Sequence, residues 1–118
     1  MFISKELIDN FSKAYRNEQS VVCYAESQSF GGPSNKVIMV MDEEILYLIF
    51  LNVTLTKVIH VTEIKRDSLS EESIKNSGFS LSVTWRFKVS HTKWRFIIMK
   101  KILTLGDMQR EFIDKISH

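Results

Sequence analysis

The residues best suited to chemistry lie in one basic stretch. Seven basic residues and no acidic residue occur between Ile74 and Gly106. Four of them flank one predicted turn and fall on the outward face of the strands beside it: Arg86, Lys88, Lys93 and Arg95. Like charges that neighbour each other across a sheet destabilise it, so this cluster is typical of a site that holds an anion, such as a phosphate head group or an acidic peptide.

A second interpretation of the basic stretch is an ordinary solvated face. In that case the fold brings up acidic residues that offset the charge: Glu26, Glu63 or Asp114. Binding to anionic liposomes that weakens with added salt would separate the two interpretations.

Other reactive residue types do not form a recognisable catalytic or metal-binding pattern. The three histidines, His60, His91 and His118, are scattered along the chain, and Cys23 stands alone in a predicted strand. This spacing matches no metal site, and a lone cysteine in a strand is typical of a small core residue. The adjacent carboxylates of residues 42–44 point apart in a turn. We therefore expect no enzyme activity, no metal and no cofactor.

Composition and charge restrict the class of protein. The chain has 118 residues, of which 44% are hydrophobic and 25% charged, so we expect one soluble domain over residues 1–118. The net charge of +2 is too small to predict nucleic-acid binding. The single cysteine fits a reducing compartment, the first residues do not have the pattern of a signal peptide, and the longest apolar run, Ile45 to Leu51, is far too short to span a bilayer. These features predict a cytoplasmic protein.

The hydrophobic pattern predicts a run of strands between two helices. An N-terminal helix is expected over about 4–16, capped by Ser4, and a C-terminal helix over about 104–117, capped by Thr104. Gln109 falls on the solvent side of the second helix. Six or seven strands are expected over about 21–99, and residues 65–78 are predicted to be a long connection.

The clearest strand signal is the strict alternation of residues 79–89. Residues 90–93 are expected to turn the chain, so that Val89 faces Trp94 in the returning strand. In this register Lys88 lies opposite Arg95 on the outer face.

The hairpin of residues 37–51 is apolar on both faces, so something must cover each of them. We favour the N-terminal helix as the cover of the second face, and a second subunit is the competing candidate. If a partner or second copy covers it, the expected interface consists of Phe30, at the tip of a glycine-rich loop, and hairpin residues: Leu46, Leu48 and Phe50.

These elements resemble the bacterial pleckstrin-homology-like (PH-like) domains, which are related to GRAM domains. The similarity covers residues 17–116: the polar step at Asn17-Glu18-Gln19, the apolar segments 36–42 and 45–48 of the hairpin, the tryptophan-bearing final strand and the closing helix. Two features depart from the pattern, namely the acidic turn at residues 42–44, where a basic residue is common, and the additional N-terminal helix. The resemblance implies a partly open antiparallel barrel or sandwich, mainly β, closed by the C-terminal helix.

The PH-like resemblance also implies a function, because such domains mostly bind proteins or lipid head groups. We therefore expect a non-catalytic binding module whose partner is another protein or a second copy of the chain. Peripheral binding to anionic lipid head groups through the basic strands is the alternative. A second alternative is an α+β cone with an apolar pocket for a small ligand, which would require a large cavity between helix and sheet.

Overall fold

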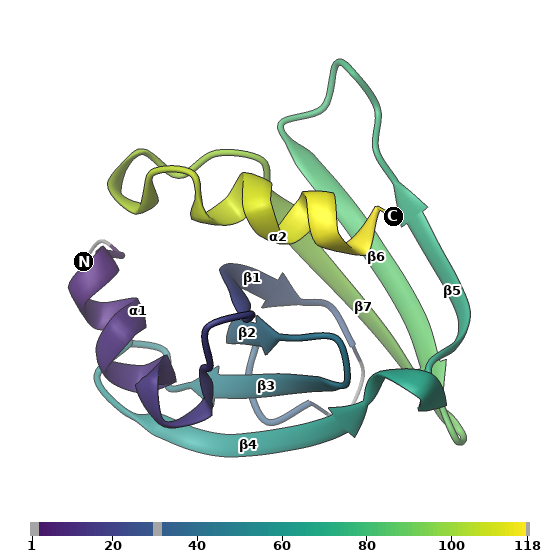
Figure 1. The fold of residues 1–118 in the computed structure, drawn as a ribbon, viewed down its shortest axis with the longest axis horizontal. Helices are drawn as coiled ribbons and strands as arrows, with labels where there is room; N and C mark the ends of the chain where they lie inside the picture. Colours follow the sequence, from purple (N-terminus) through teal and green to yellow (C-terminus); the bar gives the residue numbers. More distant parts are fainter. Residues whose placement is uncertain (1–2, 30–31, 118) are drawn as a thin grey trace.

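The computed structural model describes residues 3–29 and 32–117, which Figure 1 shows as a ribbon. Within these residues seven strands lie between two short α-helices, and three 3-10 helices form connections. In chain order the elements are α1 (Lys5–Ser12), η1 (Lys13–Tyr15), β1 (Val21–Ser27), β2 (Lys36–Met41), β3 (Ile45–Leu51), β4 (Val58–Lys65), η2 (Arg66–Ser68), β5 (Ser70–Lys75), β6 (Ser82–Val89), β7 (Thr92–Met99), η3 (Leu103–Leu105) and α2 (Met108–Ile116).

The strands form one antiparallel sheet with the order β4-β3-β2-β1-β7-β6-β5. Strand β1 pairs with β2 over most of its length, but it pairs with β7 only at Glu26 and Ser27. The sheet turns a corner at this short contact, so that β6 and β7 cross the β1–β4 half at a steep angle in Figure 1. Strands β4 and β5 remain as open edges. The predicted fold class is confirmed: a mainly β, partly open antiparallel sheet with a helix at each end of the chain.

Two hydrophobic cores occupy opposite faces of the β1–β4 half. The inner core lies between the bent sheet and α2, and its largest members include Trp85, Phe96 and Phe112. The outer core lies under α1, where Ile8 is fully buried against side chains of β1, β2 and β3. The hairpin is therefore apolar on both faces because α1 covers the outer face, whereas β6 and β7 together with α2 cover the inner face. The expected cover of the second face by the N-terminal helix is confirmed.

The two α-helices begin differently. The Ser4 hydroxyl accepts the Leu7 amide hydrogen at 3.1 Å, which confirms the predicted cap of α1. The predicted start of the second helix at Thr104 is wrong, because residues 103–105 form a 3-10 turn and α2 begins at Met108. The Thr104 hydroxyl instead donates to the Ile3 carbonyl, which ties the two ends of the fold together. Among the described residues, no helix is long and apolar enough to cross a membrane.

The strand boundaries differ from the sequence prediction in two places. Residues 70–75, expected in a connection, form the edge strand β5, which pairs with β6. Strand β6 begins at Ser82 rather than at Phe79, and both Phe79 and Leu81 are exposed in the loop before it. Alternation marks residues that could form a strand, but a ladder also requires a partner for their backbone groups.

Gln109 was predicted to face solvent, and this prediction is wrong. Its side chain is fully buried, where Oε1 accepts the Tyr24 amide hydrogen at 2.8 Å. The Nε2 group donates to the carbonyl oxygens of Tyr24, at 2.9 Å, and of Met99, at 3.0 Å. Gln109 thus fastens α2 to β1 and to the end of β7, the two strands that meet at the corner of the sheet.

Candidate functional site

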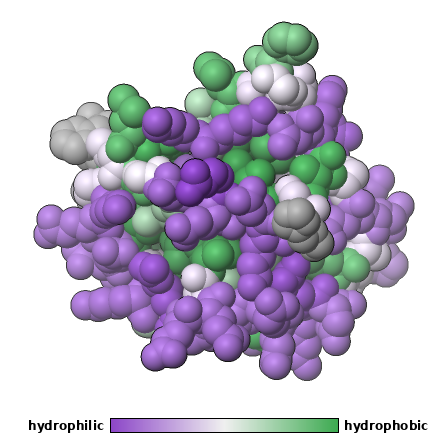
Figure 2. Space-filling model, turned by 45° about the horizontal axis from the view of Figure 1, so that its top comes forward, coloured by the Kyte–Doolittle hydropathy of each residue, from purple (hydrophilic) through white to green (hydrophobic). Residues whose placement is uncertain are grey.

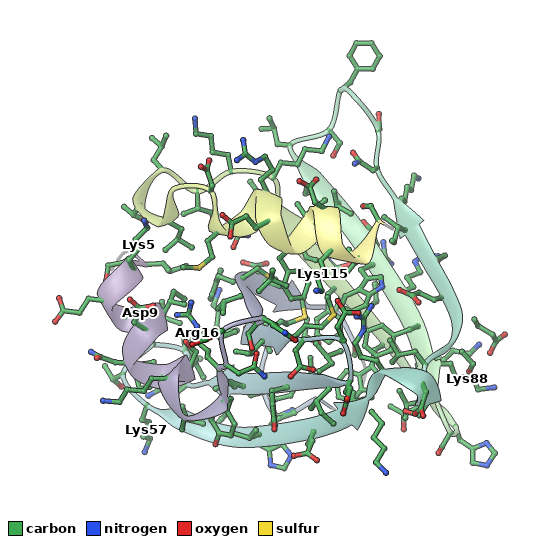
Figure 3. All side chains as sticks on the ribbon, viewed as in Figure 1. Lys5, Asp9, Arg16, Lys57, Lys88 and Lys115 are labelled. Atoms are coloured by element: carbon green, nitrogen blue, oxygen red, sulfur yellow. The ribbon has the colours of Figure 1, made fainter. Side chains whose placement is uncertain are left out.

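The four predicted basic residues do share one surface. Inward side chains of β6 and β7, such as Trp85 and Phe96, fill the core, and alternation therefore turns the basic residues outward. Figure 3 places Lys88 at the outer side of the sheet, close to the β6–β7 turn. The α1 helix covers the outer face of the β1–β4 half, whereas the outer face of β5–β7 carries these charges.

The register of the β6–β7 hairpin differs from the prediction by two residues. Val89 pairs with Thr92, so the turn consists of Ser90 and His91 alone. Consequently Lys88 lies opposite Lys93, and Arg86 lies opposite Arg95. The two-residue turn requires a left-handed residue, and Ser90 supplies it with φ of 54°. A shift of two residues leaves every side chain on its predicted face, which is why the basic cluster survives the error.

These four side chains line a surface hollow of about 850 Å³, which we call the basic groove. Its lining residues come from three parts of the chain: Gln28 and Ser29 after β1, Glu71 and Ser73 of β5, and residues 86–88 and 91–95 of the hairpin. Strand β7 is fixed to the β1 side by hydrogen bonds from the Gln28 amide to the Arg95 carbonyl, at 2.8 Å, and from the Arg95 amide to the Ser29 hydroxyl, at 2.8 Å.

The charge of the basic groove is poorly compensated. Its one ion pair joins Lys88 to Glu71 with 3.5 Å between nitrogen and oxygen. Over residues 3–29 and 32–117, no carboxylate lies within ion-pair distance of the other three cations, Arg86, Lys93 and Arg95. Of the acidic residues expected to offset the charge, Glu26 pairs with Lys36 of β2 instead. The groove therefore presents four positive charges and one negative charge to a ligand.

The predicted interface is wrong for its hairpin members. Leu46, Leu48 and Phe50 are fully buried in the inner core, where no partner can touch them. The apolar pattern showed that both faces of the hairpin are covered, but it could not show that this set points into the inner core. The fourth member, Phe30, lies outside the described residues.

The acidic turn between β2 and β3 has a structural role. Asp42 Oδ1 accepts the amide hydrogens of Glu44 and Ile45, each at 2.8 Å, and Asn17 donates to the other carboxylate oxygen at 2.8 Å. The two backbone amides are the main cause of a lowered pKa for Asp42. Next to it, Glu43 pairs with Lys115 of α2 at 2.7 Å. No group of metal-ligating side chains occurs among the residues that the structure describes.

Cys23 lies in the inner core, and burial raises the pKa of its thiol well above the usual value, although a hydrogen bond with the Met39 backbone opposes the shift. We expect Ellman's reagent to label Cys23 in native protein far more slowly than in urea, because the thiolate is both hidden and disfavoured. Because the pKa of the Cys23 thiol is higher in the folded chain than in the unfolded chain, the thiol contributes to the free energy of unfolding fully below about pH 8.5. This contribution is lost as the pH rises above that value. Rapid native labelling at neutral pH would contradict the burial.

Comparisons with known proteins give one similar structure. No protein-family description and no curated protein matches the sequence. Among solved structures, the hSac2 domain from human phosphoinositide phosphatase Sac2 is similar, with 11% identity and a TM-score of 0.49 over 99% of this chain and 80% of that one.

Proposed function

We propose that this chain is a non-catalytic binding module of the PH-like family, and that it holds an acidic segment of a partner protein in the basic groove. The observation that carries the proposal is the placement of Arg86 opposite Arg95 and of Lys88 opposite Lys93, where Glu71 is the one carboxylate among the described residues that forms an ion pair with any of the four. Like charges that face each other across a sheet repel and destabilise it. An acidic group bound between them would remove this repulsion, which the free protein otherwise retains.

The spacing of the charges favours an extended acidic peptide. Residues that face each other across the ladder lie about 5 Å apart, and successive outward residues of one strand lie about 7 Å apart. Carboxylates at alternate positions of an extended chain have the same spacing of about 7 Å. Each carboxylate would then contact one cross-strand pair. The hydroxyl of Ser73, whose residue pairs with Arg86, adds a hydrogen-bonding group at the edge of the groove.

Two observations support binding rather than catalysis or self-association. Two residues with nucleophilic or acid–base chemistry have structural roles, since Cys23 is buried and Asp42 holds a turn. The hairpin side chains that had suggested self-association are inside the core. The space that a small-ligand cone would need is occupied by Trp85, Phe96 and Phe112.

The proposal predicts a specific loss on removing the facing arginines. Each exposed charge pair contributes about 0.5–1 kcal/mol, so R86S/R95S is expected to weaken binding of an alternating Glu–Ser peptide about tenfold. The free energy of unfolding should stay the same or rise by less than about 1 kcal/mol, because repulsion is relieved. Fluorescence anisotropy measures the first effect and urea denaturation the second.

A matched control is K57S/K65S, which removes the same charge at exposed positions just before β4 and at its end. Its peptide affinity should stay within a factor of about two of the parent value, because long-range charge effects are screened by salt. A Glu–Ser peptide of the same composition with its glutamates in one block should bind more weakly. If R86S/R95S and K57S/K65S lost the same amount of peptide affinity, the basic groove would not be the binding site. If the parent protein bound phosphoinositide vesicles and R86S/R95S abolished that binding, the ligand of the groove would be a lipid head group rather than an acidic peptide.

A further inference from the structure

The loop between β5 and β6, residues 76–81, carries two strongly exposed large apolar side chains. Phe79 is fully exposed and Leu81 is 77% exposed, while the neighbouring Met99 of β7 is partly exposed. Figure 1 shows the loop projecting beyond the body of the molecule, and in Figure 2 hydrophobic side chains stand out from the same upper edge. We call residues 76–81 the apolar tip.

The apolar tip is held in place by hydrogen bonds. The Ser80 amide donates to the Ser77 carbonyl at 3.1 Å, and the Lys100 amide donates to the Leu81 carbonyl at 2.9 Å. The Lys100 ammonium donates to the Ser77 carbonyl at 2.7 Å. A braced turn thus keeps a phenyl and an isobutyl group in water, where they gain nothing from the protein's own core.

The surroundings of the apolar tip are basic. Lys75 ends β5 immediately before it, and Lys100 and Lys101 follow β7 beside it. Below it lies a hollow of about 400 Å³ whose lining includes Asn76, Lys100, Lys101, Asp107, Arg110 and Asp114. Asp107 is paired with Arg110 at 3.3 Å, whereas the three lysines make no ion pair with any residue that the structure describes. The balance is four positive charges against two negative ones.

We propose that the apolar tip docks on an anionic membrane surface, with Phe79 and Leu81 inserted at the level of the head groups and Lys75, Lys100 and Lys101 against the phosphates. A bilayer suits this shape because the tip is convex and projecting, and a soft lipid surface opens around such a wedge. Apolar insertion and attraction between lysines and anionic lipid add to each other at such a surface.

This docking surface is separate from the basic groove. The tip precedes Ser82 at one end of β6, and the groove lies toward Val89 at the other end, roughly 24 Å away at the rise of an extended strand. A chain with both surfaces can hold an acidic protein segment while it rests on a membrane. Neither surface needs the other, so their failures are distinguishable.

The test is co-sedimentation of the full chain with two kinds of vesicle, pure phosphatidylcholine and equal parts phosphatidylcholine and phosphatidylserine. The parent protein should prefer the anionic vesicles, and F79S/L81S should reduce that binding about a hundredfold, because burying each of the two side chains contributes roughly one factor of ten. Both side chains are exposed, so the variant should keep the parent unfolding curve and the parent affinity for the Glu–Ser peptide.

The matched control is V53S, which removes an apolar side chain that is 78% exposed in the loop between β3 and β4. It should bind anionic vesicles as the parent does, and so should R86S/R95S. The inference is overturned if the parent binds neither vesicle, if F79S/L81S binds as well as the parent, or if R86S/R95S removes the binding and thereby assigns the membrane to the groove.

Discussion

Replacing Trp85 by alanine is expected to remove about 3–5 kcal/mol from the free energy of unfolding. The indole is fully buried and contacts the rings of Phe87, at 4.8 Å between centroids, and of Phe112 on α2, at 5.9 Å. Its Nε1 group donates to the carboxylate of Glu72 in the edge strand β5 at 2.9 Å, so the substitution also removes this hydrogen bond between β5 and the core. Urea denaturation followed by circular dichroism measures the change.

A loss of this size is a large part of the stability of a small domain, so W85F provides a milder companion. It keeps the ring in the core and loses the hydrogen bond to Glu72, for which we expect about 1–2 kcal/mol. The control is W94A, because Trp94 is only half-buried and stacks on Phe96 at the rim of the inner core. If W85A were no more destabilised than W94A, Trp85 would not be the centre of the core.

Replacing Gln109 by methionine is expected to cost about 2–4 kcal/mol. The side chain keeps its length, but the Tyr24 amide and the carbonyl oxygens of Tyr24 and Met99 all lose a buried partner. Each unsatisfied backbone group carries the cost of having left water. Urea denaturation measures the loss, and amide hydrogen exchange at Tyr24 should become faster.

The matched substitution is Q19M, in the exposed turn before β1, where the glutamine side chain is in water. It should change the free energy of unfolding by less than about 0.5 kcal/mol. Equal stability of Q109M and the parent protein would mean that α2 is held to the sheet by apolar packing alone.

The sequence predicted the elements whose apolar pattern is strong. The hairpin of β2 and β3 is apolar on both faces, and this pattern required two covering layers, which are α1 on one face and β6, β7 and α2 on the other. Strand β5 was missed because four of its six residues are serine or glutamate, and an edge strand on the surface is specified by backbone pairing rather than by burial. The exposed pair Phe79 and Leu81 was assigned to a strand because its alternation continues that of β6.

The candidate site was predictable in part for a geometric reason. Alternation fixes which face a side chain occupies, so the four basic residues of the hairpin could be grouped without knowledge of the turn. The other walls of the groove come from distant segments, including Ser29 and Glu71, and only the folded sheet brings them together. The hidden role of Gln109 had no sequence signal, because a polar residue on an amphipathic helix normally faces water.

The β5–β7 half of the sheet is packed on its inner face only, so its outward side chains can be substituted without disturbing the packed interior. In β1–β3 a substitution on either face meets a packed core, so few replacements there are tolerated. On β6 and β7 the outward charged positions contact solvent, one another and β5 but not the packed interior, so their charges can be exchanged without repacking it. The same architecture is therefore a suitable starting point for libraries in which outward residues of these two strands are randomised to select new ligands.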